Sequence, residues 1–292
     1  MSTAEQTHPV VGILGLGLIG GSLLRRLHSQ GRQAVGWNRD PAGRAAARSQ
    51  GLQVRDEPAD VVVEADVLVT AVPLPVLADL LPLVSAAARP GTILTDVTSV
   101  KTPVRALAAS LAPQLRFVGG HPMAGTEHSG FAASEPGLFE GAVWVVCRES
   151  DTDPQAWDAV ADLAHASGAR VIEATALSHD EAVARISHVP HLLAAALAAS
   201  AAEGGELPLQ LGAGSFRDGT RVAATRPELS AAMCAGNRQA VLEALDDLTA
   251  RLAQVRSAVA STRGDVPSAE LLEFFGAGRV ARLAWEDLHA QP

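Results

Sequence analysis

The chain has 292 residues, of which 48% are hydrophobic and 19% are charged. This composition is typical of a globular protein, and the length favours two domains over one small module. With 23 Lys and Arg against 32 Asp and Glu, the net charge is −9, so the chain has no general attraction to nucleic-acid phosphates or anionic lipids. We therefore expect a small-molecule substrate and neither a nucleic-acid partner nor a membrane partner.

The apolar segments and the cysteines limit the class of protein further. The longest uncharged stretch lies between Arg185 and Glu203, includes two histidines, and is shorter than the roughly 20 apolar residues that a membrane span needs. Only Cys147 and Cys234 are present, far apart and without a CxxC pattern, which excludes a disulfide framework. These features predict a cytoplasmic protein with reduced cysteines, without a transmembrane helix and without a metal site.

Short apolar runs alternate with helical patterns in the first part of the chain. Strands are expected at residues 9–14, 33–37, 66–72, 92–96 and 115–118. Helices are expected between them at 19–29, 41–50, 74–87 and 102–111. This alternation predicts βαβ units and a parallel sheet covered on both faces. Two further apolar runs, 142–147 and 170–174, flank an expected helix at 154–167 and are expected to extend that sheet.

The pattern changes after residue 174. Long helices are expected at 177–202, 238–260 and 268–289, whereas Gly204-Gly205 and residues 211–219 are expected to be loops. We therefore predict an α/β domain over residues 1–174 and an all-helical domain over 175–292. Apolar stripes on two of these helices exceed what one small bundle needs, which favours a homodimer formed through the helical domain.

A glycine-rich turn joins the first expected strand to the first expected helix. Gly15, Gly17 and Gly20 form a G-x-G-x-x-G pattern in this strand–turn–helix context. In such a turn the first glycine permits the tight bend, the second lets the backbone approach a pyrophosphate, and the third lets helix and strand pack closely. The amides at the helix start, those of Leu18 and Ile19 included, would hold the diphosphate. The first domain is therefore predicted to be a Rossmann-type dinucleotide-binding domain.

The end of the second expected strand bears on the choice between NAD and NADP. An Asp or Glu at this place bonds the ribose hydroxyls of NAD, whereas an Arg accommodates the 2′-phosphate of NADP. The chain has Asn38 and Arg39 there, followed by Asp40. We therefore favour NADP, and NAD stays open because Asp40 could reach the ribose after a small shift of the turn. Val72, at the end of the third expected strand, is a further candidate cofactor-binding residue.

Two segments of the first domain carry candidate catalytic residues. GGHPMAGTE, at 119–127, follows an expected strand at its C-terminal end, where open α/β sheets bind their ligands. Its histidine, His121, can take or give a proton at neutral pH, and a solvent-facing turn histidine is the alternative interpretation. DVTSVK, at 96–101, ends an earlier strand with Ser99 and with Lys101, the only lysine of the chain. Both loops are expected to open on the same edge of the sheet.

The helical domain contributes candidate substrate-binding residues. In SHVPH, at 187–191, His188 and His191 are expected on one helix face, and Pro190 is expected to kink the helix. Surface histidines are the alternative interpretation, and a metal site would need a third ligand that the sequence does not identify. GSFRDGTR, at 214–221, is expected to be a flexible loop whose two arginines suit bidentate capture of a carboxylate, or else a polar interdomain loop.

The order of five motifs resembles a known enzyme family. The motifs are GLGLIGGSL, DVTSVK, GGHPMAGTEHSGF, ISHVPHLLAAAL and GSFRDGTR. Together they are similar to the prephenate/arogenate dehydrogenase family of tyrosine biosynthesis over nearly the whole chain. The resemblance implies NAD(P)-dependent oxidative decarboxylation of prephenate or arogenate to 4-hydroxyphenylpyruvate or tyrosine. In this reaction a hydride passes to the nicotinamide, the ring carboxylate leaves as CO2, and the ring becomes aromatic.

The resemblance also implies roles for single residues. His121 matches the family histidine that accepts a hydrogen bond from the ring hydroxyl and acts as the base, and Ser99 matches a serine near that hydroxyl and the nicotinamide. His191 and Arg221 match positions that line the substrate pocket, where Arg221 is expected to bind a substrate carboxylate. Glu127 matches an acidic residue near the mouth of the site.

Two other classes of protein fit part of the sequence. β-Hydroxyacid and 6-phosphogluconate dehydrogenases share the glycine turn, an Asn-Arg after the second strand and a helical second domain. That class uses a lysine of its second domain, and this chain has no lysine after Lys101. A non-catalytic dinucleotide sensor would bind the cofactor without turnover and would not need His121, Ser99 and Arg221 together. The sequence leaves open the choice between prephenate, arogenate and an amino-substituted analogue.

Overall fold

A computed structural model of the chain describes residues 8–126 and 128–290. The described residues form two compact units, the first ending at Arg238 and the second beginning at Gln239. The first unit contains both sheets and most of the helices, and the second is a pair of long helices.

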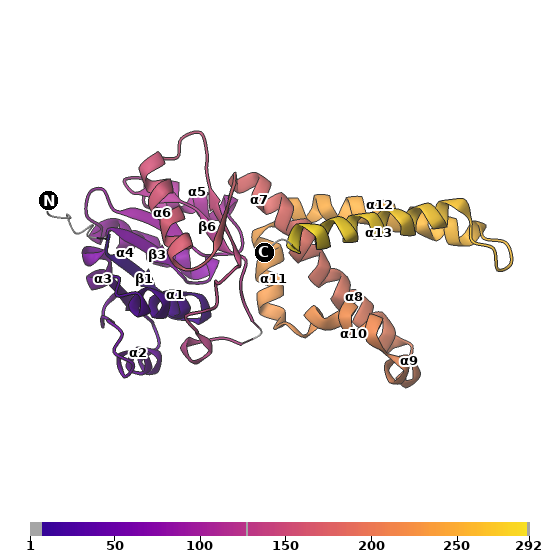
Figure 1. Ribbon diagram of the computed structural model, residues 1–292, viewed down its shortest axis with the longest axis horizontal. Helices are drawn as coiled ribbons and strands as arrows, with labels where there is room; N and C mark the ends of the chain where they lie inside the picture. Colours follow the sequence, from indigo (N-terminus) through magenta and orange to yellow (C-terminus); the bar gives the residue numbers. More distant parts are fainter. Residues whose placement is uncertain (1–7, 127, 291–292) are drawn as a thin grey trace. The chain divides into compact units, whose positions relative to one another are not determined.

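A parallel sheet forms the centre of the first unit (Figure 1). It has five strands in the order β2-β1-β3-β4-β5. Its strands are β1 (Val11–Leu14), β2 (Ala34–Trp37), β3 (Val67–Thr70), β4 (Ile93–Asp96) and β5 (Arg116–Val118). The strand order reverses between β1 and β3, and ligands of such sheets bind at this switch point, beyond the carboxyl ends of the strands. The predicted Rossmann-type sheet is confirmed.

Helices connect the five strands and cover both faces of the sheet. They are α1 (Leu18–Ser29), α2 (Pro41–Arg48), α3 (Pro58–Glu64), α4 (Leu74–Ala87) and α5 (Thr102–Leu111). Because side chains alternate along a strand, Val69 joins a buried cluster with Leu23 of α1, whereas Leu68 joins another with Leu77 of α4. The short helix α3 has no counterpart among the helices expected from the sequence.

A second sheet of three strands corrects one expectation. It consists of β6 (Gly120–Pro122), β7 (Val143–Cys147) and β8 (Arg170–Ala174), with α6 (Pro154–Ala166) between the last two. The prediction that β7 and β8 extend the parallel sheet is wrong. The chain continues from β5 through Gly119 into β6, which pairs with β7 in antiparallel orientation, and the Gly119 carbonyl accepts a hydrogen bond from Cys147 N at 2.8 Å. This pairing keeps β7 off the edge of the first sheet.

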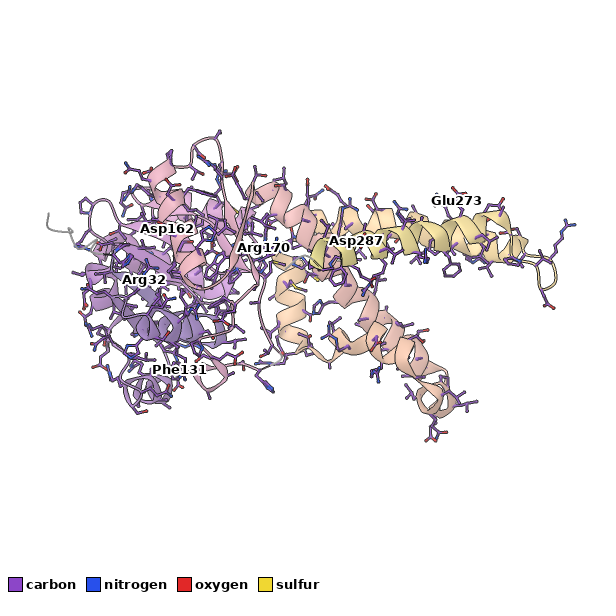
Figure 2. The ribbon with its side chains drawn as sticks, viewed as in Figure 1. Arg32, Phe131, Asp162, Arg170, Glu273 and Asp287 are labelled. Atoms are coloured by element: carbon purple, nitrogen blue, oxygen red, sulfur yellow. The ribbon has the colours of Figure 1, made fainter. Side chains whose placement is uncertain are left out.

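The segment between β6 and β7 is anchored on α1. It contains the 3-10 turn η1 (Phe131–Ala133), which begins at Phe131, labelled in Figure 2. Phe131 is 5% exposed. The Arg25 guanidinium of α1 lies 4.4 Å from the centroid of that ring. Ser22 Oγ, also on α1, accepts a hydrogen bond from Glu135 N at 2.9 Å. The helix that follows the glycine turn therefore also fixes the chain after β6.

The rest of the first unit is helical. The elements are α7 (Ala176–Val183), a π-helical turn η2 (Ala184–His188), α8 (Val189–Glu203), α9 (Glu206–Leu211), α10 (Gly214–Thr220), the 3-10 turn η3 (Arg221–Ala224) and α11 (Pro227–Gly236). The π-helical turn precedes Pro190, which cannot donate an intrahelical hydrogen bond, so the predicted irregularity lies there. The predicted loop at 211–219 is wrong: α10 forms because it packs on α8, which overrides its weak helix propensity.

The helical run from Ala176 to Glu203 is long and apolar enough to cross a membrane by length and composition alone. Core helices of soluble proteins meet the same criterion, and this run carries buried, hydrogen-bonded polar residues, described below. Both cysteines have free thiols, with Cys147 buried and Cys234 partly buried. Burial raises the pKa of the Cys147 thiol to about 12. The absence of a transmembrane helix stays a prediction.

The second unit is a helical hairpin. Its helices, α12 (Arg238–Ser261) and α13 (Ala269–His289), lie side by side (Figure 1). Ser268 caps α13, because its Oγ accepts a hydrogen bond from Leu271 N at 3.2 Å. The same hydroxyl donates to Ala258 O of α12 at 3.4 Å. The long helices expected at 238–260 and 268–289 are thus confirmed to within a residue.

Candidate active site

A cleft of about 330 Å³ lies at the switch point of the parallel sheet. It is lined by these predicted cofactor-binding residues: Gly15, Gly17, Asn38, Arg39 and Val72. They come from the turn after β1, the end of β2 and the turn after β3. The tertiary fold therefore gathers in one place residues that the sequence spreads over nearly sixty positions.

The glycine turn has the geometry that its sequence predicts. Gly15 has φ +104°, and a Cβ on it would lie 2.4 Å from Ala71 O. A Cβ on Gly20 would lie 1.9 Å from Gly15 O, so only glycine lets α1 approach the turn so closely. At Gly17 no heavy atom lies within 4 Å of the added Cβ, which leaves open space above the N-terminus of α1. A diphosphate fits this place, beside the first helical residues Leu18 and Ile19.

The residues after β2 have different tasks. Asp40 is the N-cap of α2, and its carboxylate accepts two backbone N–H groups at 3.1 and 3.0 Å. Arg44 donates to Asn38 O at 2.7 Å. Arg39 is exposed, lines the cleft, and forms no ion pair with any residue that the structure describes. Among the described side chains at this turn, the acid is engaged and Arg39 is the available cation.

His121, which lies in β6, is the first of three polar side chains joined in series. His121 Nδ1 lies 2.8 Å from Nε2 of His179, and His179 Nδ1 lies 2.8 Å from Oδ1 of Asp180. The two imidazole rings meet edge to face, with centroids 5.0 Å apart and an interplanar angle of 73°. His179 and Asp180 belong to α7 and are each 3% exposed, whereas His121 is partly buried.

Asp180 is held by the start of α5. Its Oδ1 accepts a hydrogen bond from Lys101 N at 2.7 Å, and its Oδ2 accepts one from Thr102 N at 2.8 Å. Burial raises the pKa of this carboxyl, but the hydrogen bonds from His179, Thr102 and Lys101 lower it more, so the pKa lies below its ordinary value. Asp180 is therefore a carboxylate at neutral pH, able only to accept hydrogen bonds.

Lys101 connects β4 to β6. Its ammonium is 1% exposed, forms an ion pair with Asp96 at the end of β4, and donates to Gly120 O at 2.5 Å. Gly120 N in turn donates to the other oxygen of Asp96 at 3.2 Å. A buried charge pair of this kind is tolerated because its polar atoms are satisfied. The two sequence segments expected to open on one edge of the fold do meet there, and the single lysine joins them.

The surroundings favour a neutral His121. Burial of the ring lowers its pKa well below the ordinary value, and the positive charge of Lys101 lowers it further. Nearby histidines act in the same direction, whereas the charge of Asp180 opposes them. At neutral pH His121 therefore presents one nitrogen lone pair, which is the property that a proton acceptor needs.

The other predicted substrate-binding residues occupy different environments. His188, 1% exposed in η2, accepts a hydrogen bond from Asn237 Nδ2 at 3.2 Å, and burial lowers its pKa to about 4. His191 is partly buried, and its Nδ1 donates to Ser187 O at 2.9 Å. The exposed Arg221 begins η3, which packs on α8, the helix that carries His191. Its predicted flexible loop is thus wrong, since tertiary contact makes the segment helical.

Two more candidates complete the predicted set. Ser99 is partly buried in the turn between β4 and α5. Glu127 lies outside the described residues.

The sequence did not reveal three polar residues near His121 and His188, namely His179, Asp180 and Asn237. The first two form a His-Asp pair directly after the change from strand to helix patterns, a signal that was present. Asn237 carries no comparable signal, because a single Asn after a helix is common.

The Rossmann-type sheet, the glycine turn and the cleft define a dinucleotide-binding protein. Two family models match the chain: "Prephenate dehydrogenase, nucleotide-binding domain" at residues 21–173 and "Prephenate dehydrogenase, dimerization domain" at 175–277. The cyclohexadienyl dehydrogenase of Zymomonas mobilis is 33% identical over 287 residues, 96% of this chain and 97% of the relative. The chain therefore belongs to the prephenate/arogenate dehydrogenase family and is an oxidoreductase.

Solved structures agree with this assignment. A protein from Corynebacterium glutamicum with a provisional assignment as prephenate dehydrogenase has a TM-score of 0.88 and 40% identity, covering 96% of this chain and 89% of the other. The prephenate dehydrogenase of Aquifex aeolicus, in complex with hydroxyphenyl propionate and NAD+, has a TM-score of 0.84 and 25% identity, covering 97% and 99%. The similarity extends over both parts of the chain.

Proposed function

We propose that the chain oxidatively decarboxylates prephenate or arogenate, using a nicotinamide dinucleotide as hydride acceptor and His121 as base. The family supports the reaction, and the partial burial of the His121 imidazole, which lowers its pKa and so favours the neutral ring, carries the role of the base. The bound nicotinamide supplies the acceptor for the hydride that leaves the hydroxyl-bearing ring carbon. The chain's own residues bind the ring, orient it and move the proton.

His121 acts on the ring hydroxyl. Its free nitrogen accepts the hydroxyl proton as the hydride leaves, so that the C–O bond becomes a carbonyl. Loss of the ring carboxylate as CO2 then returns an electron pair to the ring, the carbonyl oxygen becomes a phenol oxygen, and this oxygen recovers the proton from His121. The imidazole is regenerated, and protons and electrons balance. Formation of the aromatic ring supplies the driving force, so the protein mainly positions the reactants.

Both candidate substrates carry two carboxylates and need fixed polar partners. We assign Arg221 to a substrate carboxylate, because an exposed guanidinium can bind it in bidentate fashion. Ser99, in the turn after β4, is assigned to the ring hydroxyl, and His191 to the pocket wall. The family resemblance also supports Glu127 at the mouth of the site. His188 is assigned to the same pocket. Because it is buried and bonded to Asn237, it would support the pocket wall from the protein interior.

NADP is the favoured cofactor. Arg39 lines the cleft without an ion pair among the described residues, whereas the acid that follows it in the sequence, Asp40, caps α2 with its carboxylate. A guanidinium can hold a 2′-phosphate in bidentate fashion. These contacts support NADP over NAD.

The molecule is proposed to be a cytoplasmic homodimer that associates through its helical part, with the domain boundary between residues 174 and 175. The match to a dimerization domain supports the dimer. So do large apolar side chains exposed on the hairpin, namely Val259, Leu272, Phe275, Val280 and Leu288. A large apolar patch on a protein surface often marks a site of contact with another protein chain.

One assay tests the function. Formation of reduced nicotinamide is followed by absorbance with prephenate and with arogenate, each in the presence of NAD or NADP. We expect turnover with at least one of the two substrates and a higher kcat/KM with NADP. Cofactor binding without turnover on either substrate would instead favour a dinucleotide sensor. A clear preference for NAD would contradict the assignment of Arg39 to a 2′-phosphate.

A further inference from the structure

We propose that His179 and Asp180 are positioning residues that fix the tautomer of His121, so that its Nε2, and not its Nδ1, receives the substrate proton. The inference rests on the proposed role of His121 as base. It concerns two residues of α7 that hold the imidazole from the side of the helical segment. The three side chains form an ordered series, hereafter the relay His121–His179–Asp180.

Each hydrogen bond in the relay dictates the next. Asp180 Oδ1 can only accept, so the proton in its 2.8 Å contact with His179 belongs to His179 Nδ1. A His179 ring whose single proton is on Nδ1 has its lone pair on Nε2 and accepts from His121 in the second 2.8 Å contact. His121 therefore carries its proton on Nδ1 and its lone pair on Nε2. The carboxylate sets the orientation of a proton two side chains away.

The far end of the relay is rigid. Asp180 uses its carboxylate for two backbone amides of the α5 start in addition to His179. Its own carbonyl accepts a hydrogen bond from Asn237 Nδ2 at 2.7 Å. Lys101 contacts both ends of the relay. Its backbone N–H donates to Asp180, and its ammonium donates to Gly120 O, next to His121. Both ends of the relay are thus fixed by one residue, which leaves little freedom for either imidazole to turn.

The relay also suits the charged state of His121. When Nε2 takes up a proton, the ring becomes an imidazolium whose Nδ1–H strengthens its bond to the neutral His179. Among the described residues, the charges that act on the pKa of the ring are those of Lys101, His179, His188 and Asp180. Lys101 opposes the new positive charge, and Asp180, the only carboxylate of this set, stabilises it.

A purely structural role for His179 makes a different prediction. In that case the ring would matter for packing between α7 and β6, and any side chain of similar volume would serve. In the relay the two hydrogen bonds matter and the ring shape does not. A Gln can accept from His121 through its amide oxygen and donate to Asp180 through its amide nitrogen, whereas a Phe fills the space and can do neither.

The first experiment reads the tautomer directly. Protein labelled with ¹⁵N at histidine is examined by NMR, and the His121 signals are assigned by their loss in His121→Asn. We expect the Nδ1–H form of His121 in the wild type and loss of this preference in His179→Phe. An Nε2–H form in the wild type would overturn the proposal.

The second experiment measures kcat in a double-mutant cycle. We expect His179→Phe to lower kcat about 10- to 100-fold, less than the roughly 10²- to 10⁴-fold that a general base contributes in full, and His179→Gln to recover most of that loss. In the His121→Asn background, His179→Phe should cost nothing further. His165→Phe, an exposed histidine of α6, is the matched control and should keep wild-type kcat.

The outcomes separate the relay from the base. If His121→Asn lowers kcat and His179→Phe does not, the base stands and the relay is wrong. Equal losses caused by His179→Phe with and without His121 would show that the effect does not pass through His121, which also overturns the relay. A fully active His121→Asn would refute the base and the relay together. Thermal unfolding of each variant accompanies the cycle, and His179→Gln tests the relay even if His179→Phe fails to fold.

Discussion

The local environment of His121 has a stronger effect on its protonation state than the residue type has. A free imidazole is divided between its charged and neutral forms near neutral pH, but burial and the Lys101 ammonium keep this one neutral. The sequence places His121 between glycine and proline, which indicates a special role. It cannot show that a buried lysine and a second histidine tune the ring, because these lie 20 and 58 positions away.

Replacement of the base has a specific kinetic signature. His121→Asn keeps a polar side chain and removes the proton acceptor, so we expect kcat to fall by about 10²- to 10⁴-fold with KM changed little. Steady-state kinetics with the preferred substrate and cofactor measure both constants. A variant with wild-type kcat would show that another group takes the proton.

The pH dependence follows from the direction of the His121 pKa shift. The base works only when neutral, and its pKa is lowered well below 6.5. We therefore expect kcat/KM to stay level as the pH falls from 8 through about 6.5, the ordinary histidine value, and to decline only in more acidic solution. A profile that falls with a midpoint at the ordinary value would mean that the ring is solvated in the working enzyme.

Arg39 tests the choice of cofactor. Arg39→Ser removes the guanidinium and leaves the capping carboxylate of Asp40 in place. Loss of one charge-assisted contact to a 2′-phosphate should raise KM for NADP by about tenfold and leave KM for NAD nearly unchanged. Kinetics with both cofactors provide the comparison, and an equal effect on both would place Arg39 away from the phosphate.

At the scale of elements, contacts between distant segments decide the secondary structure of those segments whose periodicity is weak. Most predicted strands and helices are present because their apolar patterns are strong, and several helices begin at a proline in the first turn. The loop predicted at 211–219 is helical because of contacts with α8, and β6 is a strand because β7 pairs with it. Such outcomes depend on partners that are distant in the sequence.

The Asp40 cap is a testable element. Asp40→Ala removes the acceptor for two amides of α2 and should lower the free energy of unfolding by about 1 kcal/mol. Thermal unfolding measures the change. Asp162→Ala, on the exposed side of α6 (Figure 2), is the matched control, since no hydrogen bond joins Asp162 to the described residues through its carboxylate. Equal effects of both substitutions would show that the cap contributes nothing specific.

At the scale of the whole molecule, the helical part leaves apolar side chains uncovered. In α13, Leu272 and Phe275 are 60% and 65% exposed. They lie one helical turn apart, so they share a face. A chain with a net charge of −9 can keep such a face in solution, but covering it in a dimer removes apolar surface from water.

The proposed dimer is sensitive to charge on this face. Leu272→Asp together with Phe275→Asp would place two carboxylates in the interface, and desolvation would cost more than the contact returns. We expect a dimer for the wild type and a monomer for the variant by light scattering coupled to size-exclusion chromatography. Glu273→Lys, on the neighbouring exposed position, is the control for a change of charge alone (Figure 2). A variant that remains dimeric would place the interface elsewhere.

The sequence by itself determined the parallel sheet, the glycine turn, the succession of long helices and the family, because these depend on local periodicity and on contiguous motifs. It also identified His121, whose neighbours along the chain are unusual. Only the tertiary structure decided that Asp40 caps α2, that β7 pairs with β6, and that His179 and Asp180 stand behind His121. Hydrogen bonds and desolvation depend on distance in space, and folding brings together residues whose separation along the chain carries no such information.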